Sequence, residues 1–215
     1  MLLELGKNEK RYAYSQTIII MTALTGKYTL SQYFEQEIQS QTRHEYFDGK
    51  IIAMTGGTPT HNRIISNLLV ALYAGLKNQP YAVFVTDQRL WIPERQIATY
   101  PDIMVMPEPL TYQEGRKDTL INPVLIAEVL SAATANYDRE EKFAAYRTIA
   151  TFQEYLLISQ ERLYIEHFQK EGAPQSGSLR DRWLFRTYES DTIIHLNSLR
   201  VEVEIADIYN KVIFS

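Results

Sequence analysis

The 215-residue sequence contains no cysteine, which excludes disulfide bridges, thiolate metal ligands and cysteine nucleophiles. This absence fits a reducing compartment, and we expect a cytoplasmic protein. No apolar run reaches the roughly 18 residues that a membrane helix requires. Basic residues are not in excess either, because the sequence contains 22 Lys and Arg and 26 Asp and Glu. The net charge of -4 argues against a surface that coats nucleic acid throughout, although it is compatible with a local basic groove.

The remaining composition is typical of a globular protein with a core, because 45% of the residues are hydrophobic and 22% are charged. The length fits a single domain. Residues 1–20 have neither the long apolar centre nor the small-residue cleavage site of a signal peptide. We therefore predict a flexible extension over residues 1–26 and one domain over residues 27–215. Met21 is the expected natural start, which would make the residues before it dispensable.

Hydrophobic periodicity predicts the order of the elements. Asp48-Gly49 lies between two apolar runs, an arrangement typical of a hairpin, because both turn residues tolerate positive φ. Apolar residues recur at helical spacing from Ile64 to Leu76 and predict a long amphipathic helix. The other predicted elements are a first helix capped by Thr29 or Ser31, helices over 137–149 and 205–212, loops over 55–60 and 170–180, and strands at Asp102, 81–85, 88–92, 124–130, 156–159, 163–169, 183–188 and 192–196. The pattern predicts an α/β fold, with a mixed sheet flanked by helices and additional C-terminal antiparallel strands.

Two carboxylates lie in or beside apolar runs that are typical of buried strands. Pro101 fixes φ and cannot donate to a sheet ladder, so Asp102 is expected at the first residue of a strand or at a bulge. Taken alone, Asp102 is better explained as an Asp that enters a strand and bonds a nearby backbone group. Glu128 is harder to explain structurally, because it is expected to share a strand face with Val124, Ile126 and Leu130 and would need a basic partner.

An ionised carboxylate that leaves water is costly unless a cation or hydrogen bonds compensate it. Two carboxylates on neighbouring strands therefore predict a divalent metal ion between Asp102 and Glu128. In the next helix Asp138, Lys142 and Tyr146 are spaced at i, i+4 and i+8 and share one face. A solvated Asp–Lys pair worth about 0.3 kcal/mol is one explanation of this spacing. The other is that Lys142 leans over the two carboxylates.

Other polar and aromatic residues have simpler explanations. His44 lies on the opposite side of its strand from Glu45, which indicates a surface or structural role. His61 precedes the periodic part of its helix, and we expect a capping or exposed histidine there rather than a ligand. Asp87 is expected to be a turn residue. The 15 tyrosines are scattered along the strands, which is typical of packing rather than of base stacking.

Several of these residues, taken in order, resemble the PD-(D/E)xK nuclease superfamily, and above all its Uma-type restriction-endonuclease branch. The residues that carry the resemblance are Pro101-Asp102, Glu128-Val129-Leu130-Ser131, Thr134, Asp138, Lys142 and Tyr146, together with 43–51 and His61. The similarity spans about residues 28–208. The usual lysine of the superfamily would stand at Leu130, whose apolar side chain cannot replace it. The Uma-type branch takes its lysine from the following helix, where Lys142 is the matching position.

The resemblance implies a restriction-endonuclease-like sheet and a metal-dependent DNA endonuclease that hydrolyses phosphodiester bonds. The implied catalytic residues are Asp102, Glu128, Lys142 and Glu45, with His61, Asp138 and Tyr146 as further candidates. Mg²⁺, or Mn²⁺ in its place, would be bound by Asp102, Glu128, Glu45 and the Val129 carbonyl, because hard cations prefer oxygen ligands. Contacts to DNA phosphates are predicted for Arg63, Lys77, Arg89, Arg95, Arg139 and Arg147.

A homodimer is expected, because each active site of such a nuclease cuts one strand of a duplex. Two alternatives stay open. One is a catalytically silent module of the same fold that binds nucleic acid or supports assembly, which the net charge and Leu130 favour. The other is a phosphodiesterase that acts on small molecules. The sequence indicates no membrane association and no protein partner.

Overall fold

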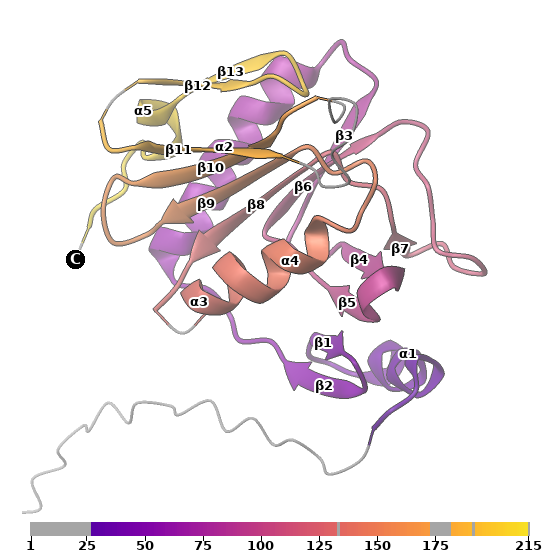
Figure 1. Ribbon diagram of the computed structural model, residues 1–215. Coiled ribbons are helices and arrows are strands. Elements are labelled where there is room, and N and C mark those ends of the chain that lie inside the picture. The colour runs from indigo at the N-terminus through magenta and orange to yellow at the C-terminus, as the bar shows by residue number, and fades with distance from the viewer. Residues whose placement is uncertain (1–26, 133, 173–181, 191, 215) are drawn as a thin grey trace, which may run out of the picture.

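A six-stranded mixed sheet forms the centre of the structure, a computed structural model that describes residues 27–132, 134–172, 182–190 and 192–214 (Figure 1). Its strand order is β11-β10-β9-β8-β6-β3, and only β8 and β9 run parallel within this order. The strands are β3 (Tyr81–Val85), β6 (Ile103–Pro107), β8 (Leu125–Leu130), β9 (Glu154–Ser159), β10 (Ile165–Lys170) and β11 (Trp183–Tyr188). The predicted α/β class is confirmed.

Two smaller sheets complete the β-structure. A five-stranded sheet has the order β2-β1-β5-β4-β7, and β12 pairs with β13 in a separate antiparallel pair. Their strands are β1 (His44–Phe47), β2 (Lys50–Ala53), β4 (Arg89–Ile92), β5 (Ile97–Thr99), β7 (Thr119–Leu120), β12 (Ile193–Leu196) and β13 (Val201–Glu204). The hairpin predicted at Asp48-Gly49 joins β1 to β2, and both turn residues have positive φ. The predicted C-terminal antiparallel strands are therefore present, with β11 extending the large sheet.

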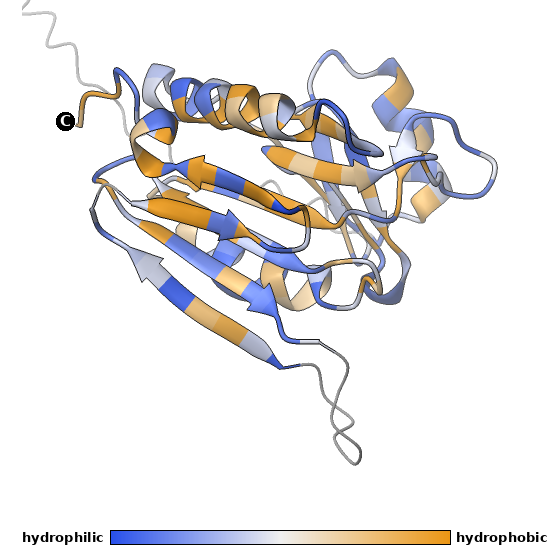
Figure 2. Cartoon of the chain, turned by 90° about the horizontal axis from the view of Figure 1, so that it is seen from above, coloured by the Kyte–Doolittle hydropathy of each residue, from blue (hydrophilic) through white to orange (hydrophobic). Residues whose placement is uncertain are grey.

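Helix α2 (Pro59–Leu76) covers one face of the large sheet, lying behind it in Figure 1. Successive side chains of a strand point to opposite faces, so Ile103, Val105 and Ala127 point toward α2. They form a core with Leu68 and Leu72 of the helix, which β12, β13 and α5 (Ile205–Ile208) extend. Figure 2 shows hydrophilic and hydrophobic residues in successive turns of α2, as expected of an amphipathic helix.

The opposite face of the sheet is covered by α3 (Ala135–Tyr137), a π-helical segment η2 (Asp138–Lys142) and α4 (Phe143–Tyr146), in front of the sheet in Figure 1. Aromatic side chains hold this helical stretch in place: the ring of Phe143 stacks on Tyr155 at a centroid distance of 5.3 Å. The helix predicted over 137–149 thus begins two residues earlier and ends at Tyr146. One reason for its early end is that the Thr148 hydroxyl bonds to the Ala145 carbonyl, which competes with further helical hydrogen bonds.

Several boundaries differ from the prediction. Strands β5 and β7 were not predicted, because two or three residues are too few to show an alternating pattern. Strand β13 was missed although its four residues, Val201–Glu204, alternate between apolar and acidic side chains. Helix α1 (Leu30–Gln39) is capped by Thr29, the first of the two predicted capping residues, and α5 ends four residues earlier than predicted. The extension over 1–26 and most of the loop over 170–180 lie outside the described residues. The single domain over 27–215 stays a prediction. Among the described helices, none is long and apolar enough to cross a membrane.

Helix α2 begins five residues before the predicted periodic stretch. The Thr58 side chain accepts a hydrogen bond from the His61 N–H, and Pro59 occupies the first helical position. We expect Thr58→Ala to lower the free energy of unfolding by about 1 kcal/mol, because the cap is lost. Urea denaturation followed by circular dichroism measures this change. Thr60→Ala within the first turn is the control, and an equal effect of both substitutions would contradict the capping role of Thr58.

Candidate active site

Asp102 and Glu128 meet where β6 begins beside the middle of β8. The Asp102 N–H donates a hydrogen bond to Glu128 Oε2 at 3.1 Å, and the Val129 N–H donates to Asp102 Oδ2 at 2.8 Å. Asp102 precedes β6 directly instead of being its first residue or a bulge. The reason is that its N–H bonds to a side chain rather than to the neighbouring strand. The two carboxylates are thus held together by reciprocal hydrogen bonds, each from a backbone amide of the other strand region.

Lys142 reaches the same point from η2. Its Nζ lies 3.1 Å from Glu128 Oε1 and 3.7 Å from Glu45 Oε1. Nζ is also 3.1 Å from Asp138 Oδ1, in an ion pair whose geometry is not that of a hydrogen bond. The lysine side chain is only 11% exposed. Burial lowers the pKa of Lys142, but the charges of Glu128, Glu45 and Asp138 outweigh it and raise the pKa well above its usual value. Lys142 is therefore an ammonium ion at neutral pH.

Glu128 is the most buried carboxylate in direct contact with Lys142, with 3% of its side chain exposed. Burial raises its pKa to about 8, although the Lys142 ammonium opposes this shift. The Tyr146 hydroxyl donates to Glu128 Oε1 at 2.7 Å, and burial together with the Glu128 charge raises the pKa of Tyr146. The Tyr146 hydroxyl therefore keeps its proton at neutral pH and donates it in the hydrogen bond to Glu128. The Lys142 ammonium and the hydrogen-bond donors around Glu128 stabilise its ionised form, and a bound metal ion would stabilise that form further.

Glu45 comes from β1 and brings the five-stranded sheet to the site. It accepts a hydrogen bond from the Thr99 hydroxyl of β5, and its charge faces Lys142. Thr99 was not predicted, because it lies in a three-residue strand that leaves no sequence signal. The ring of Tyr137 also lies near Lys142, with Nζ 5.6 Å from its centroid. The contacts of Glu45 indicate that it orients the lysine, and metal ligation by Glu45 stays a prediction.

His61 lies in the site, although the sequence favoured a capping or exposed histidine. Its Nε2 is 3.1 Å from Asp102 Oδ2, and its side chain is 15% exposed. The difference arises because α2 starts at Pro59, which places His61 in the first turn, and helical side chains project toward the N-terminus. Burial lowers the pKa of His61, but the hydrogen bond and charge of Asp102 outweigh it, so that the pKa is raised. His44 instead contacts Glu37, in keeping with its predicted structural role.

The oxygen atoms at this point fit a hard divalent cation. Within the described ranges, no three His, Asp or Glu side chains are arranged to hold a metal ion. Mg²⁺ nevertheless keeps several water ligands and is commonly bound through one or two carboxylates. Asp102 and Glu128 supply two carboxylates. The Val129 carbonyl faces the same side as its N–H, which bonds Asp102, because both groups of a strand residue point to one neighbour. Metal binding by Asp102, Glu128 and the Val129 carbonyl stays a prediction.

Comparison with known proteins assigns the chain to a family. The sequence profile of the Uma2 family, described as "Putative restriction endonuclease", matches residues 30–206. The chain belongs to the Uma2 family. Two relatives from Synechocystis sp. carry the names "Uncharacterized protein sll1609" and "Uncharacterized protein slr1290". The first is 40% identical over 157 residues, 73% of this chain and 89% of the relative. The second is 30% identical over 190 residues, 87% and 94% of the two chains.

A solved structure shares the fold of this Uma2 protein. It is a crystal structure from Anabaena variabilis, titled as that of "a putative nuclease belonging to DUF820". The TM-score is 0.67 at 18% sequence identity, and the alignment covers 86% of this chain and 99% of the other. At this identity the likeness concerns the fold alone. The restriction-endonuclease-like architecture predicted from the sequence is thereby confirmed.

Leu130 of the Uma2 protein lies in the core, where its side chain packs on the same face as Met104 and Phe143. A lysine at this position would be buried among apolar groups. Lys142 instead brings its ammonium to the acidic residues from η2, as the resemblance implied. The Leu130 carbonyl accepts a hydrogen bond from Gln160 Nε2 at 3.0 Å, and Gln160 Oε1 accepts one from the Thr58 hydroxyl at 2.7 Å. Gln160 therefore ties the start of α2 to the end of β8, a role that its sequence context did not indicate.

Three of the basic residues predicted to contact phosphates, Arg89, Arg139 and Arg63, form hydrogen bonds within the protein. Arg89 is only 6% exposed, and its guanidinium donates to the Tyr100 hydroxyl at 2.8 Å. The prediction of a phosphate contact is therefore wrong for Arg89, which is a buried structural residue. Arg139 forms hydrogen bonds with Glu166, and Arg63 donates to the Lys211 carbonyl.

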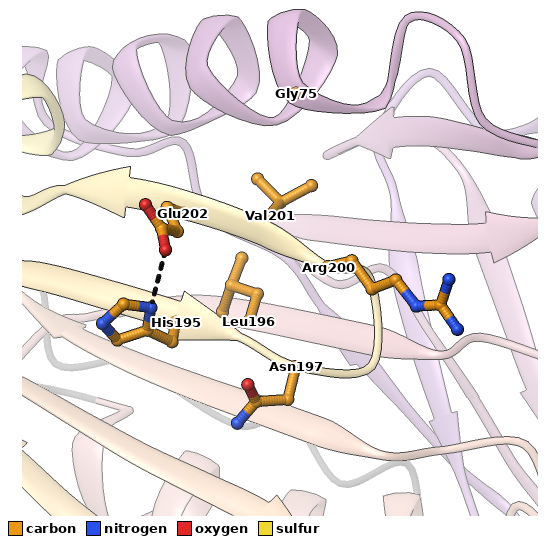
Figure 3. A pocket seen from close by; sticks show the side chains of 7 residues that line it. All are labelled: Gly75, His195, Leu196, Asn197, Arg200, Val201 and Glu202. Atoms are coloured by element: carbon orange, nitrogen blue, oxygen red, sulfur yellow. Dashed lines mark ion pairs between the residues drawn. The ribbon is translucent and has the colours of Figure 1, made fainter.

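A hollow of about 540 Å³ lies away from the candidate site, between the end of α2 and the β12–β13 pair (Figure 3). Its lining residues are Gly75, His195, Leu196, Asn197, Arg200, Val201 and Glu202. The ion pair between His195 and Glu202 is mostly exposed to solvent, with 61% and 66% of the two side chains accessible. None of the predicted site residues is among the lining residues of this hollow.

Proposed function

We propose that this Uma2 protein is a divalent-metal-dependent endonuclease that hydrolyses phosphodiester bonds in DNA. The observation that supports this best is the convergence of Lys142 and Asp102 on Glu128. The ammonium of Lys142 lies 3.1 Å from one oxygen of Glu128, and the Asp102 N–H bonds the other. Lys142 and Asp102, brought from separate elements, thus both lie within hydrogen-bonding distance of Glu128. This is the arrangement that metal-assisted phosphodiester hydrolysis needs.

Asp102, Glu128 and the Val129 carbonyl would hold Mg²⁺. When bound, Mg²⁺ lowers the pKa of a water ligand and neutralises charge on the scissile phosphate. Lys142 orients the attacking hydroxide or stabilises the negative charge that develops in the transition state. Asp138 and Glu45 hold the ammonium in place, and Tyr146 holds the Glu128 carboxylate through its hydroxyl. His61 contacts Asp102 Oδ2 through Nε2.

The main alternative is a catalytically silent module of the same fold. The observation in its favour is that Lys142 has three carboxylate partners, as expected of an ion cluster whose role is only structural. A phosphodiesterase of small molecules is the second alternative and uses the same acids. We also propose that the DNA endonuclease acts as a homodimer, since cutting both strands of a duplex requires two active sites.

Cleavage of supercoiled plasmid by the wild-type protein tests the proposal. We expect relaxed and then linear DNA with Mg²⁺ or Mn²⁺, no cleavage with EDTA, and recovery when Mg²⁺ is added in excess. Bis(p-nitrophenyl) phosphate is assayed in parallel. Hydrolysis of this ester without plasmid cleavage would indicate a small-molecule phosphodiesterase. Gel-shift binding of DNA without hydrolysis of either substrate would indicate the silent module.

A further inference from the structure

The two oxygens of Asp102 differ in their surroundings. Oδ2 accepts hydrogen bonds from the Val129 N–H at 2.8 Å and from His61 Nε2 at 3.1 Å. An ionised carboxylate only accepts hydrogen bonds, so Nε2 carries the proton of this contact. Oδ1 accepts no hydrogen bond from the part of the chain that the structure describes. Asp102 thus has one occupied oxygen and one that is available to a ligand.

The backbone of His61 is bonded at the start of α2, and its ring lies against Gly57. Its N–H donates to the Thr58 hydroxyl oxygen at 3.1 Å in the first turn of α2. Gly57 leaves the space that the ring occupies, because a Cβ at this position would lie 2.5 Å from His61 Nδ1 and 3.0 Å from Cγ. The neighbouring Gly56 differs, because a Cβ there would meet nothing within 4 Å. The two adjacent glycines therefore form a natural pair for a test of the position of the ring.

We infer that His61 is a positioning residue for Asp102: its Nε2–H holds Oδ2, so that Oδ1 is the oxygen presented to the metal ion. The second torsion of an aspartate is broad and roughly two-fold, so one backbone hydrogen bond leaves its orientation weakly defined. Hydrogen-bond partners of metal ligands fix ligand orientation, and their loss typically costs about 10- to 100-fold in metal affinity. This inference rests on the proposed function in one respect only, namely that Asp102 binds a divalent cation.

Mn²⁺ binding to the full-length protein, measured by isothermal titration calorimetry, tests the role of His61. We expect His61→Leu to raise the Kd for Mn²⁺ about 10- to 100-fold, because Oδ2 loses a donor. His61→Gln should largely restore the affinity, since an amide N–H can replace Nε2–H. Gly57→Ala should weaken Mn²⁺ binding by displacing the ring, while Gly56→Ala should bind as the wild type does. A purely structural His61 would change the unfolding midpoint without this pattern of affinities.

Each result bears on the inference. Unchanged Mn²⁺ affinity in both His61→Leu and Gly57→Ala would overturn it. If His61→Leu does not fold, the Mn²⁺ affinities of Gly57→Ala and Gly56→Ala are compared instead, and equal affinities would overturn the inference. A wild-type protein that binds no Mn²⁺ overturns both this inference and the metal dependence of the proposed function. The last case is a wild-type protein that binds Mn²⁺ with an affinity that His61→Leu lowers, yet cleaves neither plasmid nor ester. That result would support the positioning role of His61 and overturn only the proposed nuclease activity.

Discussion

Replacing Glu128 by Gln is expected to reduce metal-dependent plasmid cleavage about a thousandfold. A metal ion contributes several kcal/mol of transition-state stabilisation, and each ~1.4 kcal/mol corresponds to a tenfold change in rate. Gln keeps the size of Glu128, and its amide oxygen can still accept the Tyr146 hydroxyl, but its NH₂ group then faces the Asp102 N–H that Glu128 Oε2 accepts, so some stability is lost and folding has to be checked. Asp102→Asn is expected to have a similar effect. The measurement is the rate of plasmid relaxation at saturating protein, with circular dichroism as the check of folding.

Glu154 offers a matched control in the same sheet. It is a fully buried glutamate of β9 that accepts hydrogen bonds from the Asn197 N–H and the Ser198 hydroxyl, beside the β12–β13 pair. Glu154→Gln removes one buried carboxylate without touching the candidate site, and we expect unchanged cleavage. Equal cleavage by Glu128→Gln and the wild type would refute the assignment of Glu128. Equal loss in Glu154→Gln and Glu128→Gln would show that the assay reports the fold rather than the site.

Lys142→Met is expected to lower the free energy of unfolding by about 3–5 kcal/mol and to abolish cleavage. Removing one member of a buried ion cluster leaves its partners uncompensated, which is the costly case for buried charges. Here three carboxylates, Glu128, Asp138 and Glu45, lose their shared cation. Urea denaturation at pH 7 gives the stability, and the plasmid assay at a temperature where the variant is folded gives the activity.

The exposed Lys77 provides the comparison for this substitution. Lys77→Met changes the same residue type on the surface, where substitutions usually alter stability by less than about 0.5 kcal/mol. A loss of stability in Lys142→Met no larger than in Lys77→Met would contradict the uncompensated cluster. Full cleavage by Lys142→Met would show that the helix lysine has no catalytic part, even if the stability falls as expected.

The strands that carry the two acids could be predicted because their sequences are unambiguous. An apolar run of six residues interrupted by Glu128 has few structural explanations, and strand alternation correctly grouped Glu128 with Ile126 and Leu130. The grouping was wrong for Val124, which precedes β8 and lies in the core on the other face, because alternation holds only within the strand. The long α2 was recognised by its apolar spacing, since a helix that packs on a sheet must show one apolar face. The five-stranded sheet was less predictable. Its pairing depends on contacts between β1 and β5, which lie about fifty residues apart in sequence.

The contact between His61 and Asp102 was missed for a different reason. Periodicity places the start of α2 near Ile64, where the apolar face begins, but the helix starts where the backbone is capped. Thr58 followed by Pro59 is a capping residue followed by the residue favoured at the first helical position. This signal was present in the sequence and would have put His61 inside the first turn. The direction of its side chain toward Asp102 still depends on the packing of α2 against β6, which no local pattern encodes.

The π-helical segment η2 makes the site respond differently to insertions and to deletions. It spans five residues, Asp138 to Lys142, and its backbone hydrogen bonds join residues five apart instead of four. Loss of one residue between Asp138 and Lys142 would let this turn close as an ordinary α-helix, and the two charged residues, then three apart, would still share a face. One further inserted residue would instead rotate everything before it by about 100° relative to α4, the angle that one residue subtends in an α-helix. A single-codon insertion in this window would therefore act like a substitution of the charged residues themselves, whereas a single-codon deletion would not.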